Sequence, residues 1–379
     1  MTKSDEKEET LPLLSSSSKE KGLRTPTKNI FLPLGTFIYS AGLELGSTTL
    51  HQYAYNYTGQ ASSQNTSLFQ DHDNQSELSC HRNSSKHQNA NQEDAANWLM
   101  YFELMEYSIG IPMIILAGIY SDFIGRKFFI LLSVFGSAGQ LFCMFIVIYF
   151  DLHIGYLFIS SAISGIVGTH YTFSLASSVL IADTTGTGKA RSFHIALIHS
   201  YKGVGQVLAN LGSGYLIQLT GFVIPSLISS ALCFVACFTL SFEKETLTES
   251  IKTAKPSFCR SFLRFFGFFC GRGYRNNVHI LKFVANLLCF MMIMCPEVAA
   301  SSIRTLFILG EPFCFTSEMV GYFGAATDIA NHIIGTVLLK LLHLCIHDES
   351  STIIGFLSGI AKFLMIAFSM NAIMIFMSE

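Results

Sequence analysis

Long apolar runs alternate with polar connections along most of this chain. A helix that crosses a bilayer needs about 20 predominantly apolar residues, and nine segments meet this requirement. They are expected at residues 30–50, 98–119, 128–150, 154–182, 192–218, 222–242, 279–304, 319–342 and 352–376. The pattern predicts an all-α membrane protein with six helices in residues 29–242 and three more in residues 279–379.

Composition supports this class of protein. Half of the 379 residues are hydrophobic, 13% are charged and the mean hydropathy is +0.44, whereas about 25% of a typical soluble chain is charged. Residues 1–28 lack apolar periodicity and are rich in Ser, Lys and Glu, which predicts a disordered tail. The tail carries Glu9-x-x-x-Leu13-Leu14, which resembles an acidic dileucine signal for sorting to endosomes and lysosomes. A chance match in a charged tail is the alternative.

The distribution of Lys and Arg predicts the topology. Basic residues gather in the tail, at 126–127, at 189–191 and in the connection 243–278, so these parts and the amino terminus are expected to face the cytoplasm. The polar connection 51–97 is then expected to be a loop on the other side that builds no core. Glycosylation requires that side, and this loop carries four N-x-[ST] acceptors, at Asn56, Asn65, Asn74 and Asn83.

Most of the ten cysteines lie in apolar segments, where a thiol is a small hydrophobic group. Cys80 and Cys314 fall in predicted outside loops, where oxidising conditions favour a disulfide between them; two free thiols are the alternative. We find no nucleophile elbow, phosphate-binding loop or metal-ligand spacing. The sequence therefore predicts no enzyme, no bound metal, no resident cofactor and no nucleic-acid partner; its surroundings are a lipid bilayer.

A charged motif separates the second and third predicted helices: Gly118-x-x-x-Asp122-x-x-Gly125-Arg126-Lys127. Glycines permit close backbone approach at a tight turn, and fixed charges can pair with helix ends. An ordinary basic cytoplasmic loop is the alternative. The motif resembles the loop signature of the major facilitator transporters. That family implies two packed halves, and six helices followed by a basic connection and further helices match this plan.

Five other stretches resemble a narrower group, the solute carrier 46 family, which includes the proton-coupled folate transporter and lysosomal relatives. They are Gln52-Tyr53-x-Tyr55, Ile181-Ala182-Asp183, Glu245-Thr246-Leu247, Glu311-Pro312-Phe313-Cys314-Phe315 and Gly321-Tyr322. The resemblance implies a secondary active, proton-driven carrier of a small organic solute, favouring an organic anion, in a lysosomal, endosomal or plasma membrane. It also implies twelve helices, so we expect a form truncated after the ninth. A non-transporting short form that associates with a full-length homologue is the alternative.

Ionisable side chains inside predicted spans are functional candidates, because each costs at least about 2.5–3.5 kcal/mol at a helix centre. The substrate and proton candidates are Glu44, His199, Lys202, Glu297, Arg304, Asp328 and His332. Helical spacing places His199 with Lys202, Glu297 with Arg304 and Asp328 with His332 on shared faces. Snorkelling cations and hydrogen-bonded core histidines are the alternative.

The resemblance also assigns roles. The folate-transporting member has an acidic residue in helix five and a histidine in helix seven, where this chain has His199 and Glu297. This exchange keeps a proton-binding pair but argues against folate. Asp122, Arg126 and Asp183 are expected to form a cytoplasmic latch on the first half, which biases an alternating-access equilibrium.

Overall fold

The computed structural model describes residues 30–66, 85–185, 188–246, 277–310, 313–345, 348–369 and 371–378, and these contain helices and no strand. The elements are α1 (Phe31–Thr66), α2 (Ser85–Ile124), α3 (Arg126–Tyr149), the 3₁₀ turn η2 (Ile154–Tyr156), α4 (Leu157–Val167), α5 (Thr169–Thr184), α6 (Lys189–Thr220), α7 (Val223–Ser241), α9 (Asn277–Leu309), α10 (Ser317–Asp328), the π-helix η3 (Ile329–Ile334), α11 (Gly335–Cys345), α12 (Asp348–Ala367) and α13 (Ala372–Met377). The expectation of an all-α fold is confirmed.

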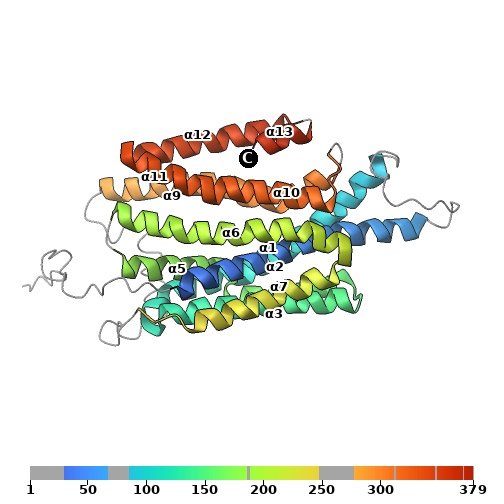
Figure 1. The fold of residues 1–379 in the computed structure, drawn as a ribbon, viewed down its shortest axis with the longest axis horizontal. Helices are drawn as coiled ribbons and strands as arrows, with labels where there is room; N and C mark the ends of the chain where they lie inside the picture. Colours follow the sequence, from blue (N-terminus) through green and yellow to red (C-terminus); the bar gives the residue numbers. More distant parts are fainter. Residues whose placement is uncertain are drawn as a thin grey trace, which may run out of the picture.

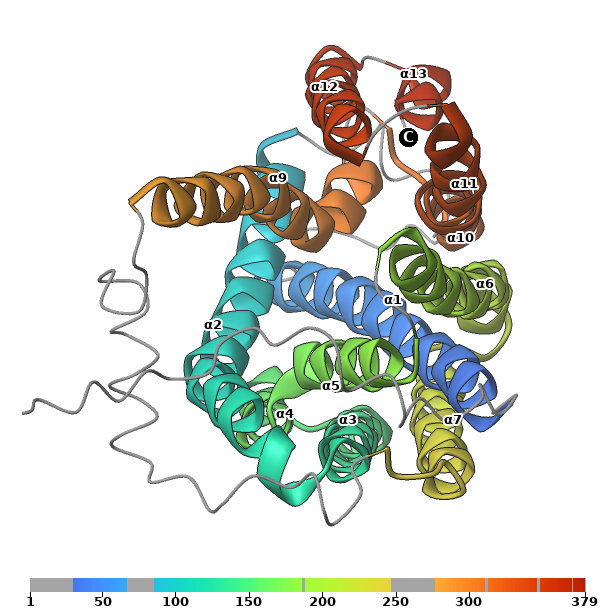
Figure 2. The ribbon, with the colours of Figure 1, turned by 90° about the vertical axis from the view of Figure 1, so that its left-hand side faces the viewer.

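Helices α1–α7 form one bundle, in which α1 packs along α6 and α7, and α3 packs along α7, α4 and α5 (Figure 2). The core of this bundle includes Tyr39, Ile130, Val134 and Leu141. The Tyr39 hydroxyl lies 2.8 Å from Ser137 Oγ, so this buried phenol has the hydrogen-bond partner that burial demands.

The remaining helices form a second group beside the first, with α10 lying along α6 (Figure 1). Its own small core contains Ile308, Phe315, Val320, Phe323 and Ile375. Ile375 belongs to α13, so the last described helix packs back against α9 and α10. The first seven helices and this second group are called the first and second half below.

Six helical segments of the described residues are long and apolar enough to cross a membrane: Gln92–Ile124, Arg126–Tyr149, Ile154–Thr184, Val223–Ser241, Phe283–Ser301 and Ser317–Leu342. The predicted spans 30–50 and 192–218 are helical as α1 and α6 but do not reach that apolar threshold. They carry polar residues that are buried against other helices, such as Thr48 on α1 and Asn210 on α6. Such residues belong in a membrane when they face protein or an internal cavity.

The predicted spans 154–182 and 319–342 are confirmed as long apolar helical segments, but these two and 352–376 depart from a single regular helix. Segment 154–182 breaks between α4 and α5, where Gly168 and Thr169 have φ of 93° and 61°. Segment 319–342 contains the π-helix Ile329–Ile334. Segment 352–376 ends as a helix at Ala367 and resumes at Ala372 after Asn371, which is extended; Asn favours caps and turns over helix interiors.

The expectation that 51–97 is a loop without a core is also wrong. Helix α1 continues to Thr66 and α2 begins at Ser85, and Gln52, Tyr53 and Ala54 are buried. The Tyr53 ring lies 5.7 Å from that of Phe222, so aromatic packing carries the helix past the apolar run. Several predicted features lie outside the described residues: the side chain of Asn65, and Asn74, Asn83, Cys80, Glu9, Leu13 and Leu14. Asn56 is exposed on α1.

Candidate functional site

The charged motif joins α2 directly to α3, with Gly125 alone between the two helices. Gly118 lies inside α2, and a Cβ placed there would meet nothing within 4 Å. The predicted close approach is therefore wrong for Gly118. Gly125 does need glycine, because its φ is 129° and a Cβ would collide with the carboxylate of Glu245.

Arg126, which is 8% exposed, joins three helices. Its Nη1 lies 2.5 Å from Asp122 Oδ1 on α2 and donates to Ser121 Oγ at 2.7 Å. Its Nε donates to Asp183 Oδ2 on α5 at 3.2 Å. The three residues expected to form a latch thus contact one another, all within the first half; the latching role stays a prediction.

Glu245 completes this cluster, although only the family resemblance had singled it out. Its Oε1 accepts from the backbone N–H of Arg126 at 3.1 Å, and its Oε2 from that of Lys127 at 3.0 Å. A carboxylate is favourable at the positive end of a helix, so Glu245 caps α3 from the segment after α7. Lys127 Nζ donates back to Ser241 O at 2.6 Å. The available signal was an acid placed directly after the sixth predicted helix.

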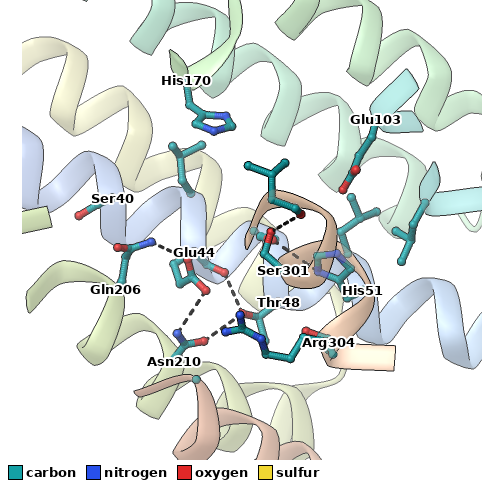
Figure 3. A pocket seen from close by; sticks show the side chains of 18 of the residues that line it. Ser40, Glu44, Thr48, His51, Glu103, His170, Gln206, Asn210, Ser301 and Arg304 are labelled. Atoms are coloured by element: carbon teal, nitrogen blue, oxygen red, sulfur yellow. Dashed lines mark hydrogen bonds between the residues drawn. The ribbon is translucent and has the colours of Figure 1, made fainter. Parts of the chain in front are cut away.

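A cavity of about 620 Å³ lies between the two halves (Figure 3). Its charged and imidazole side chains are Glu44, His51, Glu103, Glu106, His170, Lys202, Glu297, Arg304, Asp328 and His332. Apolar side chains, among them Leu43, Leu99, Phe102, Leu141 and Phe323, cover other parts of the wall. Such a mixture suits a ligand with an apolar body and a few polar groups.

Side-chain amides and carboxylates form a hydrogen-bond network in the wall of this cavity. Glu44 Oε2 accepts from Gln206 Nε2 at 2.9 Å, and Glu44 Oε1 accepts from Asn210 Nδ2 at 3.2 Å. The same Asn210 nitrogen donates to Asp328 Oδ2 at 2.8 Å, and Thr48 Oγ1 donates to Asn210 Oδ1 at 3.1 Å. A search for ionisable groups passes over Gln206 and Asn210 because neutral amides carry no charge.

Glu297 and Arg304 share a face of α9 and form an ion pair, with Arg304 Nη2 3.1 Å from Glu297 Oε1. Lys362 Nζ on α12 lies 3.2 Å from the same oxygen. Glu297 is therefore held between two cations, and this group ties α9 to α12.

The cavity gathers some of the predicted histidines and not others. His332 lies in the π-helix and lines the cavity, as does His170 next to the break before α5. His199 is exposed and is not among the lining residues. The expected pair of His199 and Glu297 is therefore not brought together around this cavity.

Two further acids, Glu103 and Glu106, line the wall contributed by α2. Glu106 accepts from Gln140 Nε2 at 3.0 Å and from Ser164 Oγ at 2.9 Å, so its charge is solvated by α3 and α4. Within the described residues, no group of three or more His, Cys, Asp or Glu side chains could hold a metal ion. Cys314 is disulfide-bonded; because Cys80 is outside the described residues, their pairing stays a prediction.

Comparison with known proteins gives concordant results. A family model described as Major Facilitator Superfamily matches residues 34–378. The proton-coupled folate transporter of Rattus norvegicus is 24% identical over 284 residues, 72% of this chain and 59% of that protein. The lysosomal proton-coupled steroid conjugate and bile acid symporter SLC46A3 of Bos taurus is 29% identical over 314 residues, 79% of this chain and 66% of that protein.

The crystal structure of the human organic anion transporter MFSD10 (TETRAN) superposes with a TM-score of 0.62 at 15% identity. The match covers 92% of this chain and 81% of that one, and it shows a shared fold. The chain spans about three fifths of the length of the folate transporters that it matches.

Proposed function

This chain belongs to the Major Facilitator Superfamily, and on that premise we propose that it is a proton-coupled carrier of an organic anion that works by alternating access. Its relatives are multi-pass membrane transporters, and both kinds named above are described as proton-coupled. The resemblance to the solute carrier 46 family that the motifs predicted agrees with these relatives. Their activity is transport and not the catalysis of a reaction.

The observation that carries this proposal is the cavity, because both halves contribute to its wall. Glu44 and Lys202 come from the first half, and Arg304 and Asp328 from the second. In a carrier that alternates between two states, the solute binds where the halves meet. A relative movement of the halves would then change the shape of this wall and the side from which it is reached.

Two features of the wall support the proposed substrate class. Lys202 and Arg304 supply an ammonium and a guanidinium group to the wall, and apolar side chains cover other parts of it. An anionic group on an apolar body would satisfy both features. The names of the relatives support this class, since one of them is described as a steroid conjugate and bile acid symporter.

The driving force and the location belong to the same proposal. A proton gradient across a lysosomal, endosomal or plasma membrane would drive uptake, with the amino terminus in the cytoplasm. The cluster of Asp122, Arg126 and Asp183 would keep α2, α3 and α5 together as one moving body while the halves separate. No resident cofactor is needed for such a cycle.

Transport into proteoliposomes tests this function. We expect vesicles that contain the chain to accumulate radiolabelled taurocholate or oestrone sulfate when a pH gradient is imposed, and to lose the accumulation when a protonophore collapses it. Lys202→Gln should reduce uptake, because the variant removes a cation from the cavity. Lys340→Gln is the matched control, since Lys340 lies on α11 and does not line the cavity.

Equal uptake by protein-containing and empty vesicles, for both anions and in both directions of the gradient, would reject transport of this substrate class. Uptake that ignores the gradient would reject proton coupling while leaving transport in place.

A further inference from the structure

One buried amide connects carboxylates from the two halves. Asn210 Nδ2 donates one hydrogen to Glu44 Oε1 of α1 and the other to Asp328 Oδ2 at the end of α10. Asn210 is 4% exposed and Asp328 is 9% exposed. The bridge therefore lies in a part of the molecule where an uncompensated charge is costly.

The second oxygen of Asp328 takes no part in the amide bridge. Within the described residues Asp328 makes its hydrogen bond through Oδ2 alone, although it lines the cavity and is nine-tenths buried. A buried carboxylate normally needs partners for both oxygens. Oδ1 thus remains available as an acceptor on a residue that lines the cavity, and a proton there would turn it into a donor.

The charges around the bridge sum to an excess of one negative charge. Lys202 interacts electrostatically with both Glu44 and Asp328. Arg304 also interacts with Asp328 but is bonded to Glu297. The carboxylates of Glu44 and Asp328 therefore share the single positive charge of Lys202.

Other titratable groups approach from each neighbouring element. They are His51 of α1, Glu103 and Glu106 of α2, His170 of α5, Glu297 of α9 and His332 of η3; His199 of α6 interacts electrostatically with His332. His332 follows Asp328 by one helical turn, inside the π-helix. The Asn210 bridge is distinguished by its geometry, because a single amide nitrogen donates to carboxylates of both halves.

We propose that Glu44, Asn210 and Asp328 form the proton-binding site of this carrier, with the proton held on Asp328. This inference rests on the proposed function. One proton cancels the excess negative charge of the two carboxylates and removes their repulsion across the boundary between the halves. The proton binds on one side of the membrane and is released on the other. Its binding and release change the attraction that α1 and α6 exert on α10, and alternating access requires the halves to move in response to such a change.

The packing around the bridge explains how proton binding at Asp328 can act on the contact between the halves. A Cβ placed at Gly324 would lie 2.7 Å from Asn210 Cγ, and one at Gly321 would collide with Asn210 O. Helix α10 therefore approaches the backbone and amide of Asn210 as closely as glycine allows. A change in the attraction at Asp328 acts directly on this contact, with no intervening side chain.

Two transport modes, measured in the same proteoliposomes, test the site. Asp328→Asn and Glu44→Gln are neutral replacements of similar shape. We expect each to lose at least 90% of gradient-driven accumulation of labelled taurocholate, because no proton is carried. We expect each to retain at least half of the exchange of labelled for unlabelled taurocholate at equal pH, because exchange requires no net proton movement.

Glu318→Gln is the matched control: it makes the same chemical change on α10, outside the cavity, and should keep both modes. Asp328→Glu restores an acid and should regain part of the accumulation. Gradient-driven accumulation at the wild-type level by Asp328→Asn would overturn the site. So would loss of both modes in Asp328→Asn and Glu44→Gln alike, since that pattern belongs to substrate binding or folding.

The two proposals fail in different ways. Wild-type protein that neither accumulates nor exchanges the anion refutes the function itself. Wild-type accumulation that is proton-driven, together with unchanged coupling in both neutral variants, refutes only the assignment of the site.

Discussion

The cap that Glu245 places on α3 predicts a measurable loss of stability in Glu245→Ala. The variant removes the acceptor for two backbone N–H groups, those of Arg126 and Lys127. Loss of a helix cap costs about 0.5–2 kcal/mol, and charge-assisted hydrogen bonds are the stronger kind. Because two bonds and one favourable interaction with the helix dipole are lost, we expect the upper end, about 2 kcal/mol.

The assay is thermal unfolding of the purified protein in detergent, followed by the fluorescence of Trp98, the single tryptophan of the chain. The unfolding entropy is about 2.1 cal/mol/K per residue, so for a chain of 379 residues a loss of about 2 kcal/mol should lower the midpoint by about 2–3 °C. Glu245→Gln keeps one carbonyl acceptor and should lose about half as much. Lys244→Ala, an exposed neighbour, should stay within about 0.5 kcal/mol of wild type.

A second substitution separates the cap from a general effect. Gly125→Ala should destabilise through its φ of 129° and through collision with the Glu245 carboxylate. In the double variant with Glu245→Ala that collision is gone, so the combined loss should be smaller than the sum. Strict additivity, or equal midpoints for Glu245→Ala and Lys244→Ala, would refute the proposed cap.

Further outcomes follow from the same contacts. Gly214→Ala should lower transport, because its Cβ would lie 2.7 Å from Ser317 O of α10, whereas Gly212→Ala, with nothing within 4 Å, should not; uptake by both variants checks this. Asp122→Ala should reduce uptake while delivery to the membrane, measured by cell fractionation, stays normal, because Arg126 loses its partner on α2. Asn56→Gln should increase gel mobility if that site carries a glycan, and unchanged mobility would show that it does not.

The apolar pattern predicted the helical class and the order of the membrane segments because burial in lipid requires the same apolar lengths in any fold. The apolar pattern did not predict the positions where a helix departs from regular α-helical geometry. At the break after Gly168, Ser133 of α3 donates to Thr169 O at 2.6 Å. Such a partner cannot be recognised from the apolar run itself.

The candidate site was predicted in part for a similar reason. Charges inside apolar runs are conspicuous, so Glu44, Lys202 and Asp328 could be selected from sequence alone. Asn210 could not, since its importance lies in touching two helices at once. The distinction between Lys202, which lines the cavity, and His199, which does not, also depends on the rotation of α6, which a spacing of three residues leaves open.

The departures from regular helix lie beside the cavity. His170 follows the break at Gly168, and Asp328 immediately precedes the π-helix. Irregular helices are tolerated in a membrane where protein or a cavity satisfies their backbone, and π-helical turns are frequent at functional sites. Here the backbone carbonyl of His332 accepts from Ser200 Oγ of α6 at 3.1 Å and from Thr336 Oγ1 at 2.8 Å. The irregular turn next to Asp328 is therefore held by α6, the helix that also carries Asn210. A change at the bridge would act on α6 and on the helix of Asp328 together.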